Sequence, residues 1–147
     1  MIRVYADMVA DLFHYGHVEF LRQISALGDY VLVGINADEV AKAHKRRPVQ
    51  TMEERIESVA ACLYVDEVIP NAPWVFDATW IEKYDIDLVA HGDDYSDEQC
   101  RYHYKAPIEM GESPRVCRRL HFLRGWSNEN KQKIFPDRAG ASSSIGI

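Results

Sequence analysis

Residues 30–35 (Tyr-Val-Leu-Val-Gly-Ile) form a continuous run without charged residues and without the alternation of a strand that has one face in solvent. Such a run is typical of a parallel strand that is covered on both faces. Shorter β-rich segments at 2–6, 65–69 and 86–90 predict three further strands. Stretches with helical spacing separate them. This alternation predicts an α/β fold with a doubly wound, Rossmann-like parallel sheet that binds ligands at the carboxyl ends of its strands.

The helical stretches have recognisable spacings and caps. Val18, Leu21 and Ile24 repeat on one helical face, and Thr51 with Glu54 forms a capping box. We expect the helix after Thr51 to reach about Cys62, with Ile56, Val59, Ala60 and Leu63 inward. Less regular segments predict a short helix from Asn36, a basic loop at 41–47, a helix at 77–84, a helical turn at 99–105 and a fifth strand at 106–110; residues 111–137 show no clear period.

Length, charge and cysteine content limit the classes of protein to which this chain can belong. The chain has 147 residues, enough for one domain with a substantial core, and its longest apolar runs are too short to cross a bilayer. The net charge of −6 argues against a nucleic-acid partner, although residues 111–147 hold seven Lys and Arg against three acids. Three scattered cysteines and a first strand without a preceding leader favour a reduced, cytoplasmic protein with no membrane partner.

The segment 11–17, Asp-Leu-Phe-His-Tyr-Gly-His, lies between the first predicted strand and the first predicted helix. A helix start offers free N–H groups to an anion, and Gly16 lets a ligand approach the backbone. The imidazoles of His14 and His17 could donate hydrogen bonds to a phosphate that gains charge in a transition state. The two histidines could instead be surface or capping residues. A metal site lacks a third ligand at suitable spacing nearby.

Several motifs together resemble the nucleotidyltransferase superfamily with the H-x-G-H signature. The resemblance is closer to the cytidylyltransferases that activate phosphocholine, phosphoethanolamine or glycerol 3-phosphate. It spans about residues 2–110 and is carried by Arg3-Val4-Tyr5-Ala6-Asp7, the 11–17 segment, Asn36-Ala37-Asp38-Glu39, Lys45, Glu54-Arg55, residues 64–74, Ile86-Asp87 and His91-Gly92-Asp93-Asp94.

The resemblance implies a role for each matching residue. His14, His17 and Lys45 would be catalytic, contacting the phosphates. The implied nucleotide-binding residues are Ala6, Asp7, Gly16, His91, Asp93, Asp94, Ser142 and Ser143, and the implied residues for the second substrate are Asp7, Lys45, Arg55 and Trp74. An indole attracts an ammonium group, and Asp7 could supply the matching negative charge. Simpler interpretations remain open: a solvated basic loop around Lys45, a surface ion pair for Arg55, turn residues at 93–94, and core packing for Trp74.

The implied reaction transfers CMP from CTP to phosphoethanolamine or phosphocholine and releases pyrophosphate. Mg²⁺ would be carried mainly by the CTP phosphates, and the resemblance implies a homodimer. The alternatives are an adenylyltransferase similar to FAD synthase and a catalytically weak nucleotide-binding protein. Two departures stand out: Met8-Val9-Ala10 replaces the usual Gly-x-Phe, and the signature R-T-x-G-[IV]-S-T-[ST] aligns only in degenerate form at 137–144. We therefore divide the chain into a nucleotidyltransferase domain, 1–112, and an atypical basic segment, 113–147.

Overall fold

Five parallel strands form one sheet in the order β3-β2-β1-β4-β5. The computed structural model describes residues 1–92, 95–111 and 116–119, so Asp93, Asp94, Ser142, Ser143 and the signature at 137–144 lie outside the described residues. The elements are β1 (Arg3–Met8), α1 (Tyr15–Ser25), β2 (Tyr30–Asn36), α2 (Asp38–His44), α3 (Met52–Ala60), β3 (Glu67–Ala72), α4 (Ala78–Lys83), β4 (Leu88–His91), α5 (Asp97–His103), α6 (Lys105–Glu109) and β5 (Val116–Arg119).

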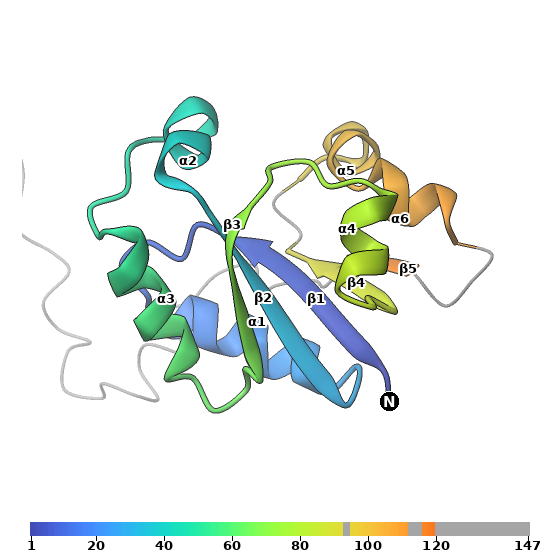
Figure 1. Cartoon of the computed structure of the whole chain (residues 1–147), viewed down its shortest axis with the longest axis horizontal. Coiled ribbons are helices and arrows are strands. Elements are labelled where there is room, and N and C mark those ends of the chain that lie inside the picture. Colours follow the sequence, from blue (N-terminus) through green and yellow to red (C-terminus); the bar gives the residue numbers. More distant parts are fainter. Residues whose placement is uncertain (93–94, 112–115, 120–147) are drawn as a thin grey trace, which may run out of the picture.

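The strand order makes the sheet doubly wound. The chain runs from β1 outward through β2 to β3, then returns to the other side of β1 with β4 and β5. The direction of winding therefore changes between β1 and β4, the place where a sheet of this kind leaves a crevice for ligands. The predicted fold class is confirmed. Figure 1 shows α2 and α5 at the end of the sheet toward which β1 points.

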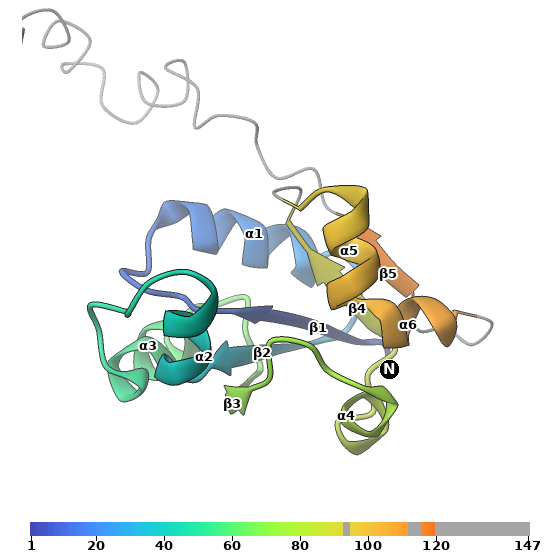
Figure 2. The ribbon, with the colours of Figure 1, turned by 90° about the horizontal axis from the view of Figure 1, so that it is seen from above.

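Both faces of the central strands are covered, as the apolar run in β2 predicted. Along β1, Val4 and Ala6 pack with residues of α1 and α3, whereas Tyr5 faces the opposite cluster with Phe76 and Ile81; these five side chains are 0–2 % exposed. The alternation follows from the two-residue period of a strand. Figure 2 shows α1 and α4 on opposite sides of the sheet.

The predicted fifth strand at 106–110 is wrong, because this segment is the helix α6. Pro107 stands in its first turn, where a proline's missing N–H has no intrahelical partner to lose. The fifth strand is instead β5, in the basic segment where we predicted no regular structure, and it pairs with β4.

The α3 prediction is confirmed at its start and wrong at its end. Thr51 and Glu54 exchange the two hydrogen bonds of a capping box, but the helix stops at Ala60, so Leu63 lies beyond it and is 91 % exposed. Ala60 is exposed as well. Arg55 occupies the inward face beside Val59 instead.

Two further boundaries differ from the prediction. The basic stretch at 41–47 begins as the end of α2, where Ala41 is buried. The third strand continues through Pro70, which an edge strand such as β3 tolerates because one side needs no ladder hydrogen bonds. Among the helices that the structure describes, not one combines the length and apolar character needed to cross a membrane.

Candidate active site

A cavity of about 450 Å³ opens at the carboxyl ends of β1, β2 and β4. The change in winding direction places three strand ends and their following loops around one space. Its lining includes Asp7, Asp11, His14, Gly16, His17, Asn36, Lys45, Arg46, Trp74, His91, Tyr95 and Tyr104.

His14 and His17 cap α1 with their own side chains. Nδ1 of His14 accepts a hydrogen bond from the Gly16 N–H at 2.9 Å, and Nδ1 of His17 accepts from the His14 N–H at 3.2 Å. An accepting Nδ1 carries no proton, so each neutral ring holds its proton on Nε2. The cap thus leaves each histidine with one N–H donor outside the cap, in a residue that lines the cavity.

The surroundings of His17 favour its neutral form. Burial lowers the pKa of His17 to about 4, and the nearby His14 and Lys45 add to this effect. The ring also stacks on Phe13, with centroids 5.3 Å apart and planes at 11°. At neutral pH the His17 side chain is therefore a hydrogen-bond donor without a charge.

The backbone before His14 is strained and held in place from outside. Ala10 and Leu12 adopt φ angles of 55° and 50°, which side chains other than glycine rarely take. Asp11 accepts hydrogen bonds from the Val49 and Gln50 N–H groups at 3.0–3.1 Å, and the Leu12 N–H donates to Oε1 of Gln50 at 2.7 Å. The bonds from Gln50 and Val49 hold the pKa of the Asp11 carboxyl below its usual range.

Asp7, near the end of β1, is a buried carboxylate that lines the cavity. Its Oδ1 is buried and has no hydrogen-bond partner among the described residues. Burial raises the pKa of Asp7 to about 6, although Asn36, Lys45 and Tyr104 favour the charged form. A buried carboxylate with one oxygen left without a hydrogen-bond donor favours a cationic ligand group.

Trp74 follows β3 and stands among aromatic rings and one lysine. The His44 imidazole stacks on the indole, with centroids 4.4 Å apart, and the His103 ring meets it edge-on at 5.5 Å. Nζ of Lys45 lies 5.8 Å from the indole centroid. The indole can thus attract a cation, and in this structure Nζ of Lys45 takes that place.

His91 ends β4 and is 5 % exposed. Its Nδ1 lies 2.6 Å from the Gly92 carbonyl oxygen, and its ring stacks on Tyr104 with centroids 4.7 Å apart. Because a carbonyl oxygen only accepts, Nδ1 is the donor in this contact. The ring is thus fixed between a loop carbonyl and the α5–α6 junction.

The structure brings most of the sequence-predicted site residues together. Asp7, His14, Gly16, His17, Lys45, Trp74 and His91 all line the cavity, whereas Ala6 is buried in β1 and does not. Arg55 does not join them: it is fully buried and bonded to protein groups described below.

Two residues that line the cavity, Asn36 and Tyr104, were not predicted as site residues. Asn36 is the polar residue that ends the apolar run of β2, which was the available signal.

The cavity lining holds two chemically different sets of side chains. His14, His17, Lys45 and Arg46 supply N–H donors and positive charge, which suit phosphate groups. Asp7 and Trp74 supply a carboxylate and an aromatic ring, which suit an ammonium group. The described residues contain no cluster of three His, Cys, Asp or Glu side chains that could hold a metal ion.

Comparison with known families decides the assignment. The model of the cytidylyltransferase-like family matches residues 6–145. The chain belongs to the cytidylyltransferase-like family. As expected for a cytidylyltransferase-like chain, the H-x-G-H turn, Lys45 and the 64–74 segment lie inside the matched range.

Two curated relatives carry more specific names. The ethanolamine-phosphate cytidylyltransferase of Arabidopsis thaliana is 46 % identical over 115 residues, which cover 74 % of this chain and 27 % of that protein. Choline-phosphate cytidylyltransferase 2 of the same plant is 47 % identical over 92 residues, covering 61 % and 30 %. This cytidylyltransferase-like chain therefore spans somewhat more than a quarter of the length of these relatives.

A solved structure shares the fold. The lipopolysaccharide core biosynthesis protein from Thermoplasma volcanium superposes with a TM-score of 0.71 over 84 % of this chain and 98 % of that one. The sequence identity is 23 %, so the likeness supports the fold alone.

Proposed function

We propose that this chain transfers CMP from CTP to phosphoethanolamine or phosphocholine and releases pyrophosphate. The observation that carries the proposal is that one cavity is lined both by groups that suit phosphate, His14, His17 and Lys45, and by groups that suit an ammonium, Asp7 and Trp74. A phosphorylated amino-alcohol has both groups that such a cavity suits, an anionic phosphate and a cation. The names of the relatives agree with this substrate class.

In the proposed reaction a phosphate oxygen of the amino-alcohol attacks the α-phosphorus of CTP. The bond from the α-phosphorus to the bridging oxygen breaks, and pyrophosphate leaves with the electron pair. Because the substrate supplies the nucleophile, the protein's task is to orient the two substrates and stabilise charge. Mg²⁺ would accompany the CTP phosphates, since phosphate oxygens and water are ligands that it prefers.

The two histidines would act as neutral donors. With Nδ1 occupied by the helix cap, Nε2–H is the group that each ring can offer to the phosphoryl oxygens. Lys45 would add a positive charge on a flexible stem, able to follow the phosphates as charge moves toward pyrophosphate. Asp7 and Trp74 would hold the ammonium end of the alcohol.

The experiment is a pyrophosphate-release assay with CTP or ATP and each of phosphoethanolamine, phosphocholine and glycerol 3-phosphate. We expect turnover with CTP and a cationic phospho-alcohol, and far less with ATP or with glycerol 3-phosphate. A preference for ATP would support an adenylyltransferase instead. Nucleotide binding by calorimetry without pyrophosphate release would support a binding protein.

A further inference from the structure

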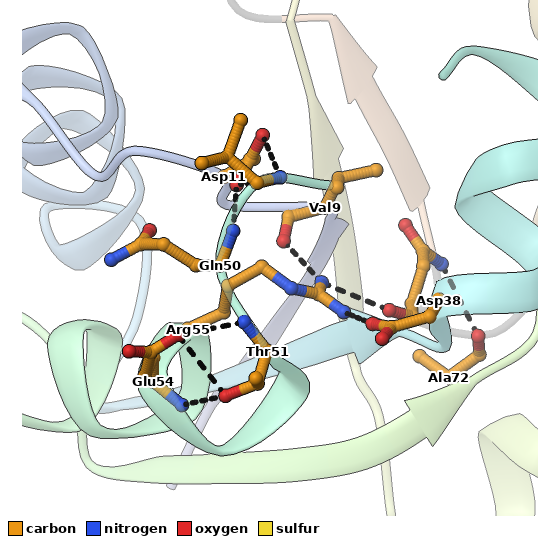
Figure 3. A network of polar contacts seen from close by, with 10 residues as sticks. Val9, Asp11, Asp38, Gln50, Thr51, Glu54, Arg55 and Ala72 are labelled. Carbon is orange, nitrogen blue, oxygen red and sulfur yellow. Dashed lines mark hydrogen bonds and ion pairs between the residues drawn. The ribbon is translucent and has the colours of Figure 1, made fainter. Parts of the chain in front are cut away.

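Arg55 is a fully buried arginine on the inward face of α3. Its Nη1 donates to the carbonyl oxygens of Val9, at 2.6 Å, and Asn36, at 3.0 Å, and its Nη2 forms an ion pair with Asp38. Figure 3 shows the guanidinium between Val9 and Asp38, which come from separate parts of the chain. A buried charge needs this kind of pairing, because an unpaired one is strongly destabilising.

Each group that Arg55 contacts begins a segment leading to the cavity. Val9 follows β1 and opens the turn that carries His14. Asp38 is the first residue of α2, which ends directly before Lys45. The third contact, Asn36, ends β2, and its side-chain amide donates to the Ala72 and Pro73 carbonyls just before Trp74. One guanidinium thus fixes the starts of the segments that carry the histidines and the lysine, and it reaches the tryptophan segment indirectly, through Asn36.

A second set of contacts joins the turn before His14 to the loop that precedes α3. In this turn, Asp11 accepts a hydrogen bond from the Gln50 N–H, and the Leu12 N–H donates to the Gln50 side chain. Gln50 directly precedes Thr51, the N-cap of α3. Arg46 forms an ion pair with Asp11 at 3.4 Å. The turn that carries the histidines is therefore held both from the interior, by Arg55 through Val9, and from the surface, by the 46–51 loop; Figure 3 shows the contacts of Val9 with Arg55 and of Asp11 with Gln50.

We propose that Arg55 and Asp38 form a positioning clamp that sets the histidine turn against Lys45. In this role Arg55 acts through the backbone and does not contact the substrate phosphate, which the family resemblance implied for it. Its side chain is absent from the cavity lining, and Asp38 already balances its charge. The effect on catalysis rests on the proposed function, but the clamp itself can be measured without turnover.

The test uses the full chain with three single substitutions. Arg55→Lys keeps the charge but removes the forked geometry that reaches Val9, Asn36 and Asp38 together. Asp38→Asn removes the negative charge but keeps the shape and an amide oxygen that can still accept from Nη2 of Arg55. Glu39→Gln is the matched control, because it removes the neighbouring exposed carboxylate of the same helical turn without touching Arg55.

The first readout is hydrogen exchange in the absence of substrate. We expect Arg55→Lys and Asp38→Asn to raise exchange in peptides covering 9–17 and 45–51, while the peptide covering 30–35 stays protected. Glu39→Gln should match the unmodified chain. Unchanged exchange at 9–17, or an equal rise across the whole chain, would overturn the clamp. This readout decides the clamp even if the chain turns out not to transfer CMP.

The second readout is the kinetics of CMP transfer. Misplacement of the reacting groups lowers kcat more than it weakens binding, so we expect both variants to lose roughly tenfold or more in kcat with KM changed less than twofold. A phosphate ligand would behave differently: Arg55→Lys would raise KM for the phospho-alcohol, and Asp38→Asn, which removes a competing negative charge, would not. That pattern would overturn the positioning role.

Discussion

The imidazole of His44 lies flat on the indole of Trp74, with ring centroids 4.4 Å apart and planes 4° apart. A ring stacked at this distance covers one face of the indole, so a ligand cation has to approach the other face. Nζ of Lys45 lies over the ring, 5.8 Å from the indole centroid, so a ligand ammonium would replace this charge at the indole while Lys45 turns to the phosphate. This spacing suits an alcohol that carries its phosphate and its cation close together.

Trp74→Ala should raise KM for phosphoethanolamine and phosphocholine, because the indole no longer attracts the cation. The expected loss is about 0.5–2 kcal/mol. Glycerol 3-phosphate has no cation, so its KM should hardly change. An equal loss for cationic and neutral alcohols, measured by pyrophosphate release, would mean that Trp74 only packs against its neighbours.

Selectivity for a cationic alcohol should depend on pH through Asp7. Its pKa of about 6 means that the carboxylate is neutralised as the pH falls through 6 and loses its attraction for an ammonium. The ratio of kcat/KM for phosphoethanolamine to kcat/KM for glycerol 3-phosphate should therefore fall below pH 6. Because both substrates carry a titrating phosphate, the ratio cancels that effect. In Asp7→Asn the ratio should be low and independent of pH.

Asp7 should also reduce stability at neutral pH. The folded pKa of about 6 exceeds the ordinary value of 3.8, so the unfolded chain loses this proton more readily and the free energy of unfolding falls as the pH rises from 4 to 6. Asp7→Asn should raise the free energy of unfolding at pH 7 by about 1–3 kcal/mol. Denaturant unfolding at pH 4 should show almost no gain. A stabilisation that is equal at both pH values would contradict burial of the charge as its cause.

Much of the fold follows from local sequence patterns. The run at 30–35, the helical spacing after His17 and the Thr51 capping box each correspond to an observed element. The 106–110 segment was misassigned because a short apolar stretch with one proline fits an edge strand or a first helical turn equally well. The length of α3 was overestimated since nothing in the sequence distinguishes an exposed Leu63 from a buried one.

The site was predictable where a residue type implies chemistry by itself. The two histidines, Lys45, Trp74 and Asp7 carry such types, and the switch in strand order then brings them together. The position of Arg55 was harder to predict, because an arginine is usually exposed. Its spacing of four residues from Val59 was the available signal, since it put Arg55 on the apolar face of its helix.

Two substitutions at His17 separate its two ring nitrogens. Asn places its amide near the position of Nδ1 and can keep the contact with the His14 N–H, whereas Gln reaches the position of Nε2 and can keep the donor toward the cavity. We expect His17→Gln to retain at least tenfold more kcat than His17→Asn, and His17→Asn to keep about 1 kcal/mol more stability through the cap. The reverse order of kcat would contradict a donor role for Nε2.

The central claim is that the histidine pair stabilises charge on the transferring phosphoryl group, and kcat of His14→Ala and His17→Ala at saturating CTP and phosphoethanolamine tests it most directly. The account predicts a loss of roughly 10²–10³-fold in kcat for each variant, as for other hydrogen-bond donors to a transition state. Folding, followed by circular dichroism, should be retained. A kcat close to that of the unmodified chain in both variants would contradict the account.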